Sequence, residues 1–135
     1  MDIDFGEYNL SSAKDRICKE KVCELLSKTY WANKRSREII MKSIENSICI
    51  GIYKNTKMVG FARIVTDYAT MYWLCDVVID EEFRGKGLGK KLIECIIEMD
   101  EIKGMYGILS TRDAQKLYAQ YGFEGASENS FMHKV

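Results

Sequence analysis

The 135-residue sequence contains no proline, a single histidine and no excess of either charge. Without proline, repeats or low-complexity stretches, no segment is typical of a linker, and we predict a single domain over residues 1–135. The 20 Lys and Arg residues balance the 20 Asp and Glu residues, so the overall charge offers no general attraction for nucleic acid or a membrane surface. Any anion site must therefore be local.

Several other classes of protein are also disfavoured. No apolar run is as long as a membrane span, and the N-terminus lacks the basic-then-apolar layout of a signal peptide, so we expect a cytoplasmic protein. The only histidine, His133, lies two residues from the end, which argues against a metal site. The five cysteines are odd in number, form no C-x-x-C pair and lie among apolar neighbours, so we expect buried, reduced thiols.

Hydrophobic periodicity predicts an α/β chain. β-Branched and aromatic runs predict strands at residues 3–10, 48–53, 58–65, 71–79, 105–110 and 130–135. Helical spacing predicts helices at about 13–28, 36–46 and 112–121, and one whose apolar face runs from Leu88 to Met99. Ser12 and Asp15 are typical of a capping box at the start of the first helix. This order predicts a mixed sheet with helices on its faces, in which 105–110 runs parallel to 71–79.

A glycine-rich basic stretch, "EEFRGKGLGKKLIE" (81–94), separates a predicted strand from a predicted helix. The first N–H groups of a helix lack intrahelical partners, and glycines let the backbone approach a ligand, so this junction favours an anion. A P-loop would need Ser or Thr where Lys91 stands, and a dinucleotide fingerprint would need glycine at Lys90. What remains is R-x-x-G-x-G, from Arg84 to Gly89.

This stretch resembles the pyrophosphate-binding motif of the GCN5-related N-acetyltransferase (GNAT) superfamily. The stretch "TRDAQKLYAQYGFE" (111–124) resembles the second hallmark of that family, A-x-x-L-Y-x-x-x-G-F. The order of elements also matches, so the resemblance covers essentially the whole chain. It implies an α/β (α+β) fold of GNAT type, with a mixed, mostly antiparallel sheet of six to seven strands, about four flanking helices and a splayed parallel strand pair.

The resemblance implies acetyl-CoA as cosubstrate and no metal. The cofactor's pyrophosphate is expected on the backbone of Arg84, Gly85, Lys86, Gly87, Leu88, Gly89 and Lys90. Its pantetheine arm is expected to pair with the backbone of Val77, Val78 and Ile79. The N–H of Val78 is expected to stabilise the tetrahedral oxyanion.

Two side chains are candidates for proton transfer. Tyr118 occupies the position of the family's general acid, and a tyrosine hydroxyl can protonate the departing thiolate. Tyr121 is expected only to pack. Asp76, an acid in an apolar strand, is a candidate base or anchor for the amine; the alternative is a strand carboxylate paired with a cation. Many family members carry Asn near the start of the second motif, where this chain reads Thr111-Arg112-Asp113.

Tyr30, Trp31 and Trp73 are candidate acceptor-binding residues, and Arg35 and Arg37, which follow the first two, are candidates to bind a carboxylate. The alternative is that Trp31 merely fixes its loop to the core. The implied function is acetyl-CoA-dependent transfer of acetyl to a primary amine of a small molecule or peptide, by direct attack in a ternary complex. The alternative is a catalytically silent acyl-CoA-binding regulatory module. We expect a monomer or homodimer with no nucleic-acid or membrane partner, and the motifs do not specify the acceptor.

Overall fold

A six-stranded sheet forms the centre of the molecule. The computed structural model of the chain describes residues 1–127 and 130–135. The strands, in sheet order, are β1 (Asp2–Phe5), β2 (Tyr8–Ser11), β3 (Ile48–Lys54), β4 (Lys57–Thr66), β5 (Met71–Ile79) and β6 (Tyr106–Ile108). Neighbours from β1 to β5 pair antiparallel, and β6 pairs parallel to β5. The predicted mixed sheet is confirmed, with a parallel pair at its edge.

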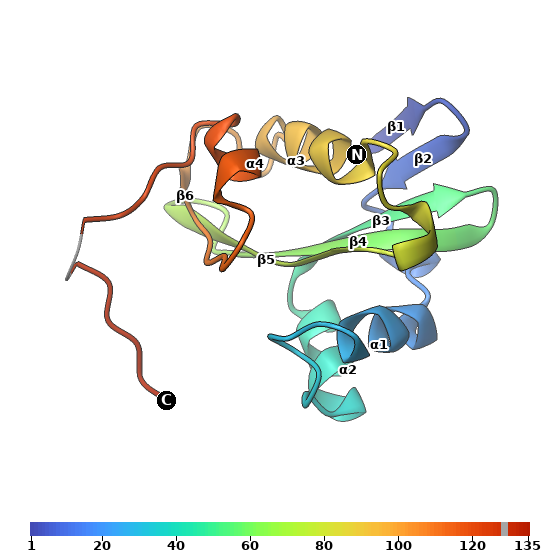
Figure 1. Cartoon of the computed structure of the whole chain (residues 1–135), viewed down its shortest axis with the longest axis horizontal. Coiled ribbons are helices and arrows are strands. Elements are labelled where there is room, and N and C mark those ends of the chain that lie inside the picture. The colour runs from blue at the N-terminus through green and yellow to red at the C-terminus, as the bar shows by residue number, and fades with distance from the viewer. Residues whose placement is uncertain (128–129) are drawn as a thin grey trace.

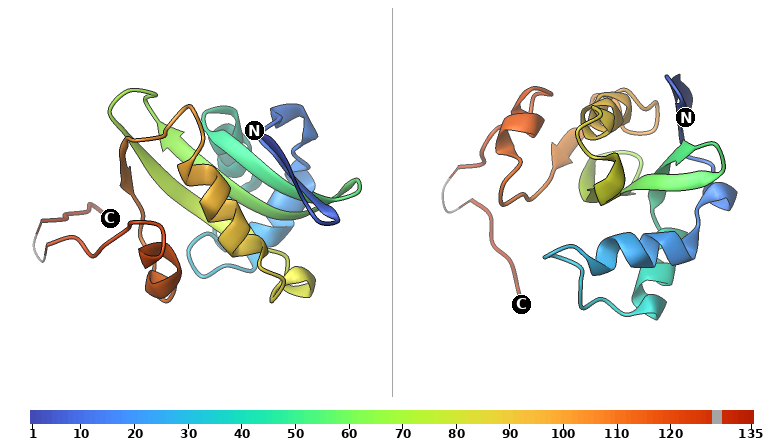
Figure 2. Two further views of the ribbon diagram at one scale, coloured as in Figure 1. Left: turned by 90° about the horizontal axis from the view of Figure 1, so that it is seen from above. Right: turned by 45° about the vertical axis from the view of Figure 1, so that its right-hand side comes forward.

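Among the described residues, four α-helices surround the sheet: α1 (Lys19–Ser27), α2 (Arg37–Glu45), α3 (Leu88–Ile97) and α4 (Gln115–Ala119). In Figure 1, α3 lies on one face of the sheet and α1 and α2 lie on the other, while α4 lies beside β6. The two further views agree, and from above α3 lies over the sheet (Figure 2). The fold therefore has three layers, and β5 and β6 lie at the end nearest α4.

The side chains of the central strands are buried on both faces. Ala62 and Ile64 of β4 belong to the hydrophobic cluster under α3, together with Leu92 and Ile96 of that helix. Phe61 belongs to the second cluster, under α1 and α2. Because helices cover both faces, the strands read in the sequence as nearly continuous apolar runs rather than alternating ones.

The N-terminal elements differ from the prediction in two places. The expected single strand at 3–10 is a hairpin of β1 and β2, because Gly6 takes a left-handed conformation (φ 60°) and turns the chain. The expected helix at 13–28 is a short 3-10 turn followed by α1 at Lys19–Ser27. The capping box does not form, since the Ser12 hydroxyl accepts a hydrogen bond from the Met1 ammonium at 2.8 Å.

The C-terminal elements are shorter than predicted. β6 covers only Tyr106–Ile108, and α4 covers only Gln115–Ala119, with Gly122 left-handed just beyond it (φ 89°). No strand forms within 130–135, so the predicted final strand is wrong. Apolar residues alone do not supply a partner strand, and Phe131 instead packs its ring on Trp73 with centroids 6.0 Å apart.

The cysteine prediction holds only in part. All five cysteines are free, but only Cys49 and Cys95 are buried. Cys18 is exposed, and Cys23 and Cys75 are partly buried. A cysteine among apolar sequence neighbours can still lie at the edge of an element, and its neighbours in the sequence do not decide its burial.

Candidate active site

β5 and β6 pair over three residues and then separate. The pairs are Met71 with Tyr106, Tyr72 with Gly107 and Trp73 with Ile108. Beyond Trp73, the rest of β5 has no strand partner on this side. Backbone N–H and C=O groups left without a partner favour an extended ligand that carries its own donors and acceptors. The splayed parallel pair predicted from the family resemblance is present.

A β-bulge interrupts β5 beside this gap. Ala62 of β4 opposes two residues of β5, Asp76 and Val77, and Asp76 has a left-handed backbone (φ 53°). Tyr72, Leu74 and Val77 all pack toward the α3 side of the sheet. Strict alternation would place Asp76 there as well, so the extra residue turns Asp76 to the α1–α2 side.

The Asp76 carboxylate is held by three side chains. Its Oδ1 accepts a hydrogen bond from Trp31 Nε1 at 3.0 Å. Its Oδ2 accepts from Arg35 Nη1 at 2.8 Å and from Arg63 Nε at 2.9 Å. Arg63 also donates to the Ser47 hydroxyl at 3.0 Å. The Asp76 side chain is only 1% exposed, so these contacts satisfy a buried charge and attach the loop between α1 and α2 to the sheet.

These contacts argue against Asp76 as the base. Burial alone would raise the pKa of its carboxyl, but hydrogen bonds and charge from Arg63 and Arg35 outweigh burial and hold that pKa below its ordinary value. Both oxygens are already occupied as acceptors. The alternative reading, a strand carboxylate paired with cations, therefore describes Asp76 better, and Trp31 does anchor its loop.

A cavity of about 310 Å³ opens where β5 and β6 separate. Its walls come from the α1–α2 loop, from β5 at the bulge, and from the segment that joins β6 to α4. The lining residues are Tyr30, Trp31, Arg35, Trp73, Leu74, Cys75, Asp76, Val77, Leu109, Ser110, Thr111, Asp113, Ala114 and Tyr118. The structure thus brings Tyr30, Trp31, Trp73, Asp76 and Tyr118 to one site from three separate segments of the chain, the α1–α2 loop, β5 and α4.

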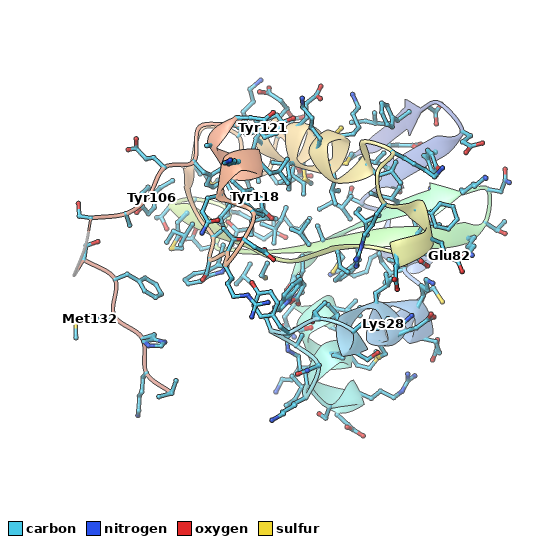
Figure 3. All side chains as sticks on the ribbon, in the orientation of Figure 1. Lys28, Glu82, Tyr106, Tyr118, Tyr121 and Met132 are labelled. Atoms are coloured by element: carbon cyan, nitrogen blue, oxygen red, sulfur yellow. The ribbon has the colours of Figure 1, made fainter. Side chains whose placement is uncertain are left out.

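Tyr118 reaches the cavity from α4, and Tyr121 lies in the turn after that helix (Figure 3). Burial, with smaller contributions from Tyr30 and Asp113, raises the pKa of Tyr118, so its hydroxyl keeps its proton at neutral pH and can donate it. The Tyr118 ring packs edge-on against Phe123, with centroids 6.0 Å apart. The hydroxyl of Tyr121 is buried with no hydrogen-bond partner among the described residues, as suits a packing role.

Tyr30 joins the two loops that border the cavity. The Arg112 guanidinium lies 3.7 Å from the centroid of the Tyr30 ring, and the Arg112 backbone N–H donates to the Tyr30 hydroxyl at 3.3 Å. Trp31 packs edge-on against Tyr30, with centroids 5.0 Å apart. The α1–α2 loop is therefore attached both to β5, through Asp76, and to the segment before α4.

The glycine stretch forms the N-terminus of α3. Gly85 and Gly87 are both left-handed (φ 77° and 78°), a conformation that favours glycine. Gly87 directly precedes the helix, and no side chain caps it, which leaves the first N–H groups of the helix open to an anion. Arg84 adds positive charge to the loop and also attaches the loop to the end of β5, because its Nε donates a hydrogen bond to the Ile79 carbonyl at 3.2 Å.

Val78, the predicted backbone donor to the oxyanion, does not line the cavity, unlike the other residues predicted around the reaction centre. Val77 lines the cavity, whereas Val78 does not, and the Val78 side chain is buried in the cluster under α1 and α2. Sequence reasoning missed the bulge itself, since no glycine or proline marks it. It also missed the contacts of Arg63 with Asp76 and Ser47, which join residues far apart in the chain.

No helix of the described residues is long and apolar enough to cross a lipid bilayer. Within residues 1–127 and 130–135, no group of three His, Cys, Asp or Glu side chains is placed to hold a metal ion.

Comparisons with known proteins identify the family. Residues 45–125 match the family model described as Acetyltransferase (GNAT) domain. The chain is 32% identical over 100 residues to the uncharacterized N-acetyltransferase ycf52 of Pyropia yezoensis, an alignment that covers 71% of this chain and 57% of that protein. It is also 32% identical over 95 residues to a spermine/spermidine N(1)-acetyltransferase of Bacillus subtilis, covering 61% of this chain and 62% of that protein. The chain thus spans less than two thirds of each of these relatives.

A solved structure from Xanthomonas campestris pv. campestris, assigned to the GNAT family, is similar over nearly the full length. Its TM-score is 0.90 at 30% sequence identity, with 95% of this chain and 92% of that chain covered. The family match, the splayed strand pair and the glycine loop before α3 agree with one another. The chain belongs to the GNAT acetyltransferase family.

Proposed function

We propose that this chain is an acetyl-CoA-dependent N-acetyltransferase that transfers acetyl to a primary amine of a small molecule or peptide. One observation carries the proposal. The gap between β5 and β6 has an uncapped, glycine-rich helix N-terminus at one end and the Tyr118 cavity at the other. This arrangement suits a long donor bound at its phosphates, extended along β5 and reactive at the cavity. We propose that residues 1–135 act as one catalytic domain, because a single sheet carries both ends.

Donor binding uses the backbone more than side chains. The proposed pyrophosphate site is the N–H groups from Arg84 to Lys90, where the helix dipole also favours negative charge. The pantetheine arm would pair with the backbone groups of Val77 and Ile79, taking the place of the strand partner that β6 does not supply. Val78, between them, was also expected to pair with the arm, but its backbone faces Phe61 of β4.

The reaction is direct attack in a ternary complex. The neutral amine forms a C–N bond to the thioester carbonyl carbon, and the carbonyl oxygen becomes an oxyanion. We assign the N–H of Val77, which lines the cavity, as its donor, since a fixed backbone dipole stabilises charge that develops in the transition state. The Val78 N–H expected from the family resemblance faces β4 instead, because Asp80, two residues further along, donates to the Val59 carbonyl and backbone groups alternate along a strand. As the C–S bond breaks, the thiolate takes the hydroxyl proton of Tyr118, and the amine proton leaves through water.

Asp76 is better described as a positioning residue than as a base. It holds the α1–α2 loop through Trp31 and Arg35, and its own oxygens are occupied. Its ionised state at neutral pH keeps that loop attached beside the cavity. We therefore assign the base to water rather than to a side chain of the site.

Turnover with an amine panel tests the function. Purified protein is mixed with acetyl-CoA and a range of amines, and release of free CoA thiol is followed while acetylated products are identified by mass spectrometry. We expect saturable turnover with at least one primary amine. Binding of acetyl-CoA without turnover of any amine would instead support a catalytically silent acyl-CoA-binding module.

A further inference from the structure

Only three charged side chains line the cavity within the described residues: Arg35, Asp76 and Asp113. Asp76 cannot be counted as a free negative charge, because two guanidinium groups, those of Arg35 and Arg63, contact its Oδ2. Two positive charges against one negative charge leave this cluster with a net charge of +1. The wall formed by the α1–α2 loop and the β5 bulge is therefore cationic.

Arg35 has donors to spare toward the cavity. A guanidinium carries five N–H donors, and that of Arg35 makes one hydrogen bond among the described residues, to Asp76. The Arg35 side chain is 23% exposed and lines the cavity. Arg63 does not line the cavity, and its guanidinium donates hydrogen bonds to Asp76 and Ser47. The pairing with Asp76 holds the Arg35 guanidinium in place, so its free edge is presented in a fixed direction. A fixed, planar set of donors matches a carboxylate.

The rest of the cavity suits a small amine. Asp113, from the segment before α4, is exposed and forms no ion pair among the described residues, so it is available to an ammonium group. Tyr30 and Trp31 supply aromatic surface, being 45% and 42% exposed. The volume of about 310 Å³ is at the lower end of small-molecule sites.

We propose that the acceptor is a small amine that also carries a carboxylate, such as an amino acid, and that Arg35 binds that carboxylate. This inference rests on the proposed acetyl transfer and names its substrate class. Asp113 would meet the amino end beside Tyr118, so the two ends of a zwitterion each find the opposite charge. A polyamine, the substrate type in the printed name of the Bacillus subtilis relative, would place further positive charge against the Arg35 wall.

Matched substrate pairs test this class. Wild-type kcat/KM is measured with acetyl-CoA for amino acids and for the amines that lack only the carboxylate: phenylalanine with phenethylamine, tyrosine with tyramine, and lysine with cadaverine. Spermidine is added as the polycation. We expect at least one amino acid to exceed its matched amine by about tenfold or more, as for a hydrogen bond to a charged group. If every matched amine, or spermidine, is the better substrate, the acceptor class is wrong while acetyl transfer stands. If no amine or amino acid is acetylated, the proposed function itself fails.

Variants of Arg35 separate binding from support of Asp76. In Arg35→Gln the preference for the amino acid over its amine should collapse toward one, through a higher KM for the amino acid. Arg35→Lys, which keeps the charge, should retain part of the preference. A purely structural role would lower kcat/KM for both members of a pair equally and would overturn the assignment. Arg37→Gln serves as the control, because Arg37 is an exposed residue of α2 paired with Glu20 and does not line the cavity.

Discussion

The two ends of the β5–β6 gap are built in different ways. The proposed donor end is a continuous stretch of chain, Arg84 to Lys90, whose character comes from left-handed glycines and open helix N–H groups. The proposed acceptor end is assembled from three segments and depends on side chains such as Trp31, Arg35 and Asp76, which meet only in the folded protein. The donor end therefore requires a particular backbone, and the acceptor end requires a particular set of partners.

This difference has a consequence for substitution. At the proposed donor end, we expect many side chains to be tolerated so long as the backbone can adopt its left-handed positions and carries no added negative charge. At the acceptor end, one substitution removes a partner from a buried ionic network, and the remaining charges stay buried without compensation. Substitutions at the two ends test this contrast, from the largest expected effect to the smallest.

The Asp76 network should contribute most to stability. Asp76→Asn keeps a residue that tolerates the left-handed conformation but leaves Arg35 and Arg63 without their counter-ion, so we expect a loss of about 3 kcal/mol in the free energy of unfolding. Urea unfolding at neutral pH measures it, with Asp100→Asn, an exposed aspartate outside the network, as the control. A loss no larger than that of the control would contradict the importance of the network.

The same variant carries a pH signature. The pKa of Asp76 is lowered in the folded protein, so the stability it contributes is complete above its unfolded-state pKa of about 3.9 and is lost as the pH falls through the lower folded-state value. Between neutral pH and that acid range, the wild type should lose more stability than Asp76→Asn. If the wild type and Asp76→Asn lost the same stability as the pH falls, carboxylates other than Asp76 would determine the acid dependence of the unfolding free energy.

Tyr118 should affect chemistry without affecting the fold. Tyr118→Phe removes the proposed proton donor, and we expect kcat to fall by about 10²-fold with acetyl-CoA affinity nearly unchanged. Because burial raises the pKa of Tyr118, loss of this donor in the wild type should begin only at a pH above the range in which an ordinary tyrosine titrates. Tyr121→Phe is the matched control, since its hydroxyl is buried without a partner. A wild-type rate in Tyr118→Phe would remove the residue from the mechanism.

The donor end should respond to charge at one backbone position. Asn and Asp both tolerate a left-handed backbone, so Gly87→Asn and Gly87→Asp differ mainly in a negative charge at the proposed pyrophosphate site. We expect acetyl-CoA affinity to be about tenfold weaker in the Asp variant than in the Asn variant, by calorimetry.

Gly104→Asn and Gly104→Asp are the control for that pair. Gly104 is also left-handed (φ 80°), an added Cβ there meets no atom within 4 Å, and the residue lies outside the proposed donor site, so these two variants should bind acetyl-CoA equally. Equal affinities in the two Gly87 variants would argue against an anion at this position.

The features that the sequence could predict are those encoded locally. Residues 84–89 predicted a helix N-terminus, because the spaced glycines are followed directly in the sequence by residues with helical apolar periodicity. The strand at 71–79 was also evident, with the bounds that β5 has. By contrast, the bulge at Asp76 depends on pairing with β4, and the Arg35–Asp76 and Arg63–Asp76 contacts depend on tertiary structure.

The wrong predictions have the same origin. The Gly6 turn divides what reads as one apolar strand, since a single left-handed glycine outweighs the strand propensity around it. Residues 130–135 have strand-like composition but no partner in the described structure. A β-strand forms only when a second segment pairs with it, and the composition of one segment does not say whether such a partner is present.

At the bulge in β5, the residues that face α3 change from even-numbered to odd-numbered. Side chains along a strand alternate between two faces, so inserting or removing one residue exchanges the faces of everything beyond it. Before the bulge, Tyr72 and Leu74 face α3; after it, Val77 and Ile79 do. The bulge absorbs the extra residue, because Asp76 and Val77 together oppose the single residue Ala62 of β4. Deletion of Asp76 would therefore leave a strictly alternating strand, with Val77 still facing α3 and Val78 still facing α1. The proposed acceptor wall can thus be removed without changing which residues of β5 enter the two hydrophobic cores.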